Sequence, residues 1–480
     1  MSDARRFALL IAATLAASLG ACGGGGGDAP APTAPPGPTT PSIATVAVTA
    51  STPVLSPGQS TQLAASAARA DGQGAAVATF AWLSETPAVA TVDATGRVTA
   101  VSPGTAVIAA TAGAVRGSTT ITVRPGPAAP LADLTRIVDS VRLAWKLPAI
   151  AAAIVTLEDG LVAVGAAGTR RASGGPAVTS DDRWHLGSNT KAMTALLAAA
   201  AVAQDRIGWT TTIAQAFPEL ASVRAEYRDV TLRELLSHQS GLTPILGNAA
   251  LGTGTTAAAQ RASAVAAVLQ QPPPSGTTRG AFEYNNVGYV VAGAMLERAL
   301  GTSFEAAMAT HVFTPLGMTD AAWGPQAAAG STTQPVAHRR QSDGSWTELE
   351  GYDLPPVFNS SGTMHMSLAS WGRFVREVLR VEAGTSTVAP ADVARQTTSP
   401  AVAINATASY GMGWGIASRA WANGKVLDHT GSNLGNASLA VLAPARNVAF
   451  LVATNGYDPA GLEALSALHG RLVAFHTTGR

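Results

Sequence analysis

The pattern of apolar and polar residues divides this chain into segments of different character. Between residues 43 and 123, short alternating stretches are separated by turn signals such as Thr95-Gly96 and Pro103-Gly104. Alternation of apolar and polar residues is typical of half-buried strands, and regularly spaced turns are typical of an all-β sandwich. Residues 43–124 are therefore predicted to form a small all-β domain.

The region 131–480 has strand patterns at both ends and helical patterns between them. It begins with apolar residues at helical spacing, namely Leu134, Ile137, Val138, Val141 and Leu143. Strands are expected at 149–157 and 161–167, helices from Ser188 to about Arg380, then further strands and a last helix over 460–475. This layout predicts an α/β (α+β) domain with a mainly antiparallel sheet and a helical region beside it.

The N-terminus carries a different pattern. Arg5 and Arg6 precede the apolar run from Phe7 to Leu19, and Cys22 follows shortly after. A basic start, a short apolar run and a small-residue exit indicate a secretory signal. The stretch ending at Cys22 resembles the bacterial lipobox, which implies a lipoprotein signal peptide over 1–22 with lipidation of Cys22. Residues 23–42 and 125–130, rich in Gly, Pro and Ala, are predicted to be linkers.

Composition narrows the function classes. The 480 residues are 47% hydrophobic and 13% charged, with a net charge of +1 and no cluster of basic residues. A nucleic-acid partner is therefore not expected. The single cysteine excludes an intrachain disulfide. No His-Glu-x-x-His, Gly-x-Ser-x-Gly or phosphate-binding glycine loop occurs, so neither a metal nor a cofactor is expected, and an α/β-hydrolase elbow is absent.

One pair of residues carries the candidate chemistry. Lys191, one of only three lysines, follows Ser188 by three residues at the predicted start of a helix. This spacing places the amine and the hydroxyl on one helix face. A buried lysine loses proton affinity and can then deprotonate a nearby serine. Alone, Ser-x-x-Lys also fits an N-capping serine followed by a solvated lysine.

Further motifs follow in a fixed order. Tyr284-Asn285-Asn286 lies about a hundred residues downstream, and His429-Thr430-Gly431 lies on a late predicted strand. Together with segments at 232–242 and 359–374, this order resembles the serine beta-lactamase and penicillin-binding protein superfamily, in its class C branch. Residues 82–110 resemble the bacterial Ig-like domain, group 2, in which Trp82 is expected to fill the core.

The superfamily resemblance implies a role for each site residue. Ser188 would be the acylated nucleophile, with Lys191 keeping the proton network poised. Tyr284, its pKa lowered by the lysine charge, would be the general base, and Asn286 would orient the substrate and bond the lysine. The remaining expected residues, which line the cleft or form the oxyanion hole with the Ser188 amide, are His429, Thr430, Gly431 and Ser432. Hydroxyl, amine and phenol are expected to meet in one pocket.

Two departures from the resemblance bear on substrate. His429 stands where most beta-lactamases have lysine, and neutral histidine attracts a carboxylate less than ammonium does. Ser370 stands where relatives often have aspartate, which is expected to affect packing more than chemistry.

The sequence thus predicts an extracytoplasmic serine hydrolase, lipid-anchored in the cell envelope, with the outer membrane favoured because Gly23, not aspartate, follows Cys22. Its substrates are expected to be esters, D-amino-acid peptides of the cell wall, or β-lactams, in falling order. The alternative is a catalytically silent lipoprotein whose Ig-like domain binds a cell-wall or surface polymer.

Overall fold

The computed structural model describes residues 42–77, 79–124, 131–244, 246 and 253–478. The chain forms two compact units, residues 1–128 and 129–480, and each is described by itself. The predicted signal peptide, Cys22 and both predicted linkers (23–42 and 125–130) lie outside the described residues, apart from Ser42 at the end of the first. No helix in the described part of the chain is long and apolar enough to cross a membrane.

The first unit is an all-β sandwich, as predicted. One sheet has the order β1-β3-β7-β6, with β4 paired to β3, and the other has the order β2-β9-β8-β5. The strands are β1 (Ile43–Ala50), β2 (Val54–Leu55), β3 (Ser60–Arg69), β4 (Gly74–Ala75), β5 (Ala81–Ser84), β6 (Ala90–Val92), β7 (Arg97–Ala100), β8 (Gly104–Ala112) and β9 (Val115–Val123). Alternate residues point inward, so Val98, Ile108 and Ile121 are fully buried between the sheets.

Trp82 packs against this core, as expected. The absence of a side chain at Gly96 makes room for it, because a Cβ there would lie 2.7 Å from the indole ring. Gly96 also has φ +83° in the turn before β7, a conformation that favours glycine.

The second unit is built on a nine-stranded sheet of order β10-β12-β11-β23-β22-β21-β20-β19-β18. All neighbours are antiparallel except β10 and β12. The strands are β10 (Ala132–Asp133), β11 (Ala149–Thr156), β12 (Gly160–Gly168), β18 (Val402–Asn405), β19 (Ala408–Tyr410), β20 (Gly415–Arg419), β21 (Gly424–Ser432), β22 (Ala437–Ala443) and β23 (Val448–Thr454). Pairing of β11 with β23 joins the two ends of the unit, which confirms the predicted layout.

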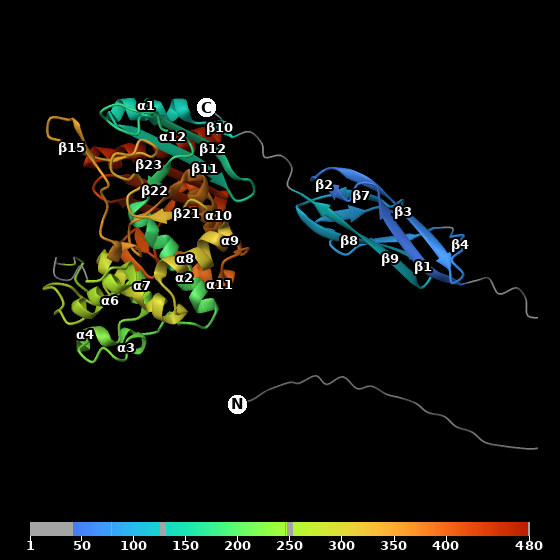
Figure 1. Cartoon of the computed structure of the whole chain (residues 1–480), viewed down its shortest axis with the longest axis horizontal. Coiled ribbons are helices and arrows are strands. Elements are labelled where there is room, and N and C mark those ends of the chain that lie inside the picture. The colour runs from blue at the N-terminus through green and yellow to red at the C-terminus, as the bar shows by residue number, and fades with distance from the viewer. Residues whose placement is uncertain (1–41, 78, 125–130, 245, 247–252, 479–480) are drawn as a thin grey trace, which may run out of the picture. The chain divides into compact units, whose positions relative to one another are not determined.

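Helices cover both faces of this sheet (Figure 1). On one face α1 and α12 pack over β11, β22 and β23, and on the other lie α10 and the helical region around α2 and α7. The helices are α1 (Thr135–Trp145), α2 (Thr190–Ala203), α3 (Ile213–Ala216), α4 (Ala225–Arg228), α5 (Leu232–Leu236), α6 (Ala257–Val268), α7 (Asn286–Leu300), α8 (Phe304–Met308), α9 (Thr314–Leu316), α10 (Leu368–Ala383), α11 (Ala391–Ala394) and α12 (Pro459–Thr478). Leu143, expected on the apolar face of α1, is instead 59% exposed, because it lies across the helix from Val138 and Val141, which are buried.

Two small sheets that the sequence analysis did not predict complete the unit. Their orders are β13-β17-β14 and β16-β15-β24. The strands are β13 (Arg183–His185), β14 (Ala322–Trp323), β15 (Ala337–Arg340), β16 (Trp346–Leu349), β17 (Met364–Ser367) and β24 (Gly456–Tyr457). Strand β13 matters most for function because it leads directly into Gly187 and Ser188.

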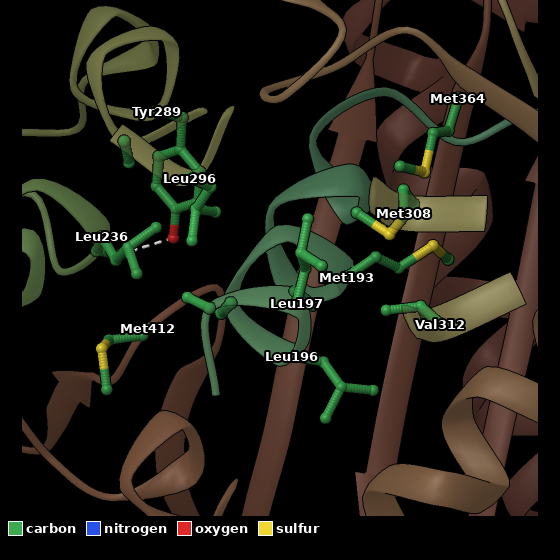
Figure 2. Packing of buried hydrophobic residues seen from close by; sticks show 14 of the residues in the cluster. Met193, Leu196, Leu197, Leu236, Tyr289, Leu296, Met308, Val312, Met364 and Met412 are labelled. Carbon is green, nitrogen blue, oxygen red and sulfur yellow. Dashed lines mark hydrogen bonds between the residues drawn. The ribbon is translucent and has the colours of Figure 1, made fainter. Parts of the chain in front are cut away.

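Helix α2 runs through the middle of the larger hydrophobic core. Nearly its whole length is buried, from Thr190 to Ala201. Figure 2 shows Met193, Leu196 and Leu197 of α2 within this core, together with side chains from the surrounding helices. A helix that is buried on all sides cannot rotate or shift without opening cavities. Residues at its N-terminus are therefore held in a fixed position.

Candidate active site

Lys191 lies at the centre of the candidate site. Its side chain is fully buried, and its Nζ contacts the Ser188 hydroxyl oxygen at 3.0 Å, Asn286 Oδ1 at 2.7 Å and the carbonyl oxygen of Ser361 at 2.8 Å. Burial holds the pKa of Lys191 well below its usual value, because the charged ammonium loses its hydration. The first turn of α2 thus carries an amine that readily becomes neutral.

Ser188 lies in a short 3₁₀ turn, Gly187–Asn189, that leads into α2. This turn packs closely against the end of β21. A Cβ on Gly187 would lie 2.3 Å from the Ser432 amide nitrogen, and a Cβ on Gly431 would lie 2.9 Å from the Ser188 amide nitrogen. The two glycines therefore allow the amides of Ser188 and Ser432 to approach each other. Two amides in this arrangement beside a nucleophile can hold a developing oxyanion.

Tyr284 and Asn286 flank the start of α7. The Asn285 side chain caps this helix by accepting a hydrogen bond from the Gly288 amide at 2.9 Å. The cap fixes Asn286 beside Lys191 and turns Tyr284 toward Ser188, which lies near enough to the phenol to lower its pKa. The Lys191 Nζ lies 4.9 Å from the centre of the Tyr284 ring. Hydroxyl, amine and phenol therefore meet in one place, although 95 residues separate Lys191 from Asn286.

The expected effect of Lys191 on Tyr284 is wrong. The pKa of Tyr284 is raised, chiefly by desolvation, and the neighbouring Ser188 opposes that rise only in part. The residue as a whole is 40% exposed. Tyr284 thus carries a protonated hydroxyl near neutral pH, whereas the pKa of Lys191 is lowered.

His429 lies below the surface at the end of β21. It is 6% exposed, its Nδ1 lies 2.6 Å from the Thr430 carbonyl oxygen, and its Nε2 lies 3.0 Å from the Tyr410 hydroxyl. Since a carbonyl only accepts, Nδ1 carries the proton and Nε2 accepts from Tyr410. Burial, helped by the charge of Lys191, lowers the pKa of His429 to about 3. His429 is therefore neutral, and both its nitrogens are occupied.

The other residues expected on β21 differ in exposure. Thr430 is exposed, while Gly431 is buried against the turn that carries Ser188. Successive residues of a strand face opposite sides of the sheet. Thr430 and His429 thus point in opposite directions.

Three residues that the sequence analysis did not assign also shape the site. Ser361 accepts a hydrogen bond from Lys191 through its backbone carbonyl oxygen. A backbone atom gives no side-chain signature in the sequence, so only the position of Ser361 in the segment 359–374 could have pointed to it. Tyr410 bonds His429 but belongs to no motif. His238, in the segment 232–242, is 1% exposed and contacts Tyr284, with ring centroids 4.4 Å apart and ring planes inclined by 40°.

The comparisons with known proteins agree with this geometry. The family model described as Beta-lactamase matches residues 142–475, and the model described as bacterial Ig-like domain (group 2) matches residues 42–123. The chain belongs to the beta-lactamase family. Its N-terminal sandwich is a group 2 bacterial Ig-like domain.

Proteins similar in sequence or fold to this beta-lactamase family member carry different names. "Penicillin-binding protein 4" from Amycolatopsis lactamdurans is 28% identical over 325 residues, which cover 66% of this chain and 83% of that protein. The penicillin-binding protein homologue from Pyrococcus abyssi has the same fold, with a TM-score of 0.58, 19% identity, and coverage of 70% of this chain and 76% of the other. A D-stereospecific amidohydrolase from Streptomyces sp. has a TM-score of 0.54 and 20% identity, with coverage of 67% and 93%.

Proposed function

We propose that this protein is a serine hydrolase that forms an acyl-enzyme on Ser188, with neutral Lys191 as the general base. The arrangement around Nζ carries this proposal. Asn286 Oδ1 and the Ser361 carbonyl can only accept hydrogen bonds, so they take the two N–H groups of a neutral amine. The lone pair that remains then faces the Ser188 hydroxyl at 3.0 Å. Burial favours this neutral form.

The steps follow from these positions. Lys191 accepts the Ser188 proton as the hydroxyl oxygen attacks the carbonyl carbon of the substrate. The oxyanion lies between the amides of Ser188 and Ser432, and each such donor contributes about 3–4 kcal/mol in comparable enzymes. Tyr284 donates its hydroxyl proton to the leaving oxygen or nitrogen and regains one from Lys191. Water then attacks the acyl-enzyme, with the same groups acting in reverse.

The state of His429 favours substrates without a carboxylate beside the scissile bond. Its imidazole is neutral, and both nitrogens are engaged with Thr430 and Tyr410. It offers neither charge nor a free donor to an anionic group. We therefore rank esters first, then amides and peptides of D-amino acids, then β-lactams. Names such as penicillin-binding protein and D-stereospecific amidohydrolase among the relatives support the last two classes.

Active-site labelling tests the nucleophile. A fluorophosphonate probe and a fluorescent penicillin are incubated with wild-type protein and with Ser188→Ala, and the labelled peptide is identified by mass spectrometry. We expect label on Ser188 in the wild type and none in the variant. Label elsewhere, or equal label on folded Ser188→Ala, contradicts the proposal.

The alternative function, a silent polymer-binding lipoprotein, is disfavoured by the intact arrangement of Ser188, Lys191 and Tyr284. Residues 129–480 form their own compact unit, so ester hydrolysis should persist when the Ig-like domain is deleted. The alternative would be favoured if the full chain hydrolysed no ester and if deletion of the Ig-like domain abolished polymer binding.

We also propose that lipid on Cys22 anchors the protein to the cell envelope, supported by the basic and apolar pattern before that cysteine. Two or more acyl chains give stable anchoring. In a Triton X-114 phase separation of cell extracts, the wild type should enter the detergent phase and Cys22→Ala the aqueous phase. Equal partition of both would contradict lipidation.

A further inference from the structure

We propose that Asp353 is a positioning residue that holds together the two segments forming the oxyanion hole. One segment is the turn with Gly187 and Ser188, and the other is the end of β21 with Ser432. Asp353 is bonded to both through buried side chains. This inference rests on the proposed function, because it concerns the geometry of the same site.

The first link runs through His185, the last residue of β13. The His185 Nε2 lies 3.0 Å from Asp353 Oδ2, and the two side chains are 0% and 3% exposed. The His185 Nδ1 accepts a hydrogen bond from the Gly187 amide at 3.1 Å. Because Nδ1 accepts, the ring proton lies on Nε2 and points at the carboxylate. Asp353 thus fixes both the tautomer and the orientation of a ring that holds the residue before Ser188.

The second link runs through Asn433, which directly follows Ser432. The Asn433 Nδ2 donates to Asp353 Oδ1 at 3.0 Å. Its Oδ1 accepts from the Asn436 amide at 3.0 Å and from Asn436 Nδ2 at 3.1 Å. Asn433 therefore ties the turn between β21 and β22 to the carboxylate. Each oxygen of Asp353 holds one of the two segments.

The energetics favour a positioning role. A buried carboxylate is expensive to desolvate, and apolar side chains of similar size often stabilise a fold as well or better. The carboxylate instead fixes the orientation of the groups bonded to it. Orientation matters because a misplacement of about 1 Å in a catalytic group can reduce the rate about a hundredfold. Here each oxygen is linked to a residue next to one of the two amides that would hold the oxyanion: through His185 to Gly187, which precedes Ser188, and directly to Asn433, which follows Ser432.

The chain offers a matched control nearby. Asp182 lies three residues before His185, and its side chain is 2% exposed. It bonds Arg170 at 2.6 Å and the Thr179 amide at 3.1 Å, not Gly187 or β21. Asp353→Asn and Asp182→Asn both replace a buried, hydrogen-bonded carboxylate by its isosteric amide, but only the first touches the proposed link.

The test measures ester kcat, KM and the Kd of a boronic acid that mimics the tetrahedral intermediate. We expect Asp353→Asn to lower kcat about 10–100-fold with little change in KM. Affinity for the boronic acid should fall by the same factor as kcat/KM, since both depend on the oxyanion hole. Asp182→Asn should lose thermal stability yet keep the wild-type kcat.

Asn433→Ala provides a second route if Asp353→Asn does not fold. It removes the link from Asp353 to β21, together with the bonds of Asn433 to Asn436, but leaves the His185 link intact, and the same kinetic pattern is expected. A folded Asp353→Asn or Asn433→Ala with wild-type kcat and boronic acid affinity overturns the inference. An equal loss of kcat in Asp182→Asn also overturns it. Absence of Ser188 labelling in the wild type would instead reject the proposed function, so the two failures are distinguishable.

Discussion

The amine nitrogen of Lys191 lies 3.0 Å from the hydroxyl oxygen of Ser188, one helical turn apart at the buried start of α2. The amine is fully enclosed, while Ser188 is partly accessible from outside. A base that is shielded from water and a nucleophile that substrate can reach thus share one rigid helix end. The predictions below follow from this pair and its neighbours.

Removal of the amine should abolish most of the activity. Lys191→Ala is expected to lower kcat/KM for an ester about a thousandfold, within the range known for general bases. Lys191→Arg is the control that keeps positive charge but cannot lose a proton, and it should be equally inactive. If Lys191→Arg had activity near the wild-type level, the positive charge and not proton transfer would be the contribution of Lys191.

The pH dependence should follow Lys191. Its pKa is lowered by burial, and the neutral amine is the active form. The rate of Ser188 acylation should therefore rise with pH through this lowered pKa and fall on the acid side of it. The measurement is the pH profile of kcat/KM. If its acid limb lay near the usual lysine pKa, about 10.4, the proposal that neutral Lys191 is the base would be contradicted.

Tyr284→Phe separates the roles of phenol and amine. Because the pKa of Tyr284 is raised, its hydroxyl acts as a protonated donor to the leaving group. The variant should lose about a hundredfold in kcat but keep the acid limb of the pH profile, which belongs to Lys191. Disappearance of that limb in Tyr284→Phe would instead identify the phenol as the base.

His429→Lys should change substrate preference. An ammonium at the end of β21 provides a charged donor, and such hydrogen bonds are worth about 1.5–3 kcal/mol. We expect penicillin labelling of Ser188 to accelerate about tenfold relative to hydrolysis of a neutral ester. His429→Gln keeps the position neutral and should not show this shift, as measured by the two second-order rate constants.

Gly187→Ala should disrupt the oxyanion hole. Gly187 has φ +50°, and a Cβ there would lie 2.3 Å from the Ser432 nitrogen. We expect at least a hundredfold loss of kcat, on the order of the loss of one oxyanion donor. Gly301→Ala is the control: its φ is +68°, but open space surrounds it, so it should lose about 1 kcal/mol of stability and no activity. Equal kinetics for both variants would contradict the close approach to β21.

Local patterns predicted the elements well because alternation and helical spacing are short-range properties. Strands at both ends of the second unit, the sandwich of the first unit and the buried Val138 and Val141 all followed from them. Leu143 was placed wrongly on the buried face, since apolar spacing cannot specify which side of a helix the sheet will cover. The short strand β13 was also missed, because three residues carry no measurable period.

The sequence by itself determined the order of the motifs and the pairing of Ser188 with Lys191, because one helical turn sets the distance between them. Only the tertiary structure decided which groups hold a proton and which amides meet. Burial lowers the pKa of Lys191 and raises that of Tyr284, and the Asp353 links join segments far apart in the chain. Desolvation and hydrogen bonding depend on neighbours that folding brings together, and no local pattern encodes them.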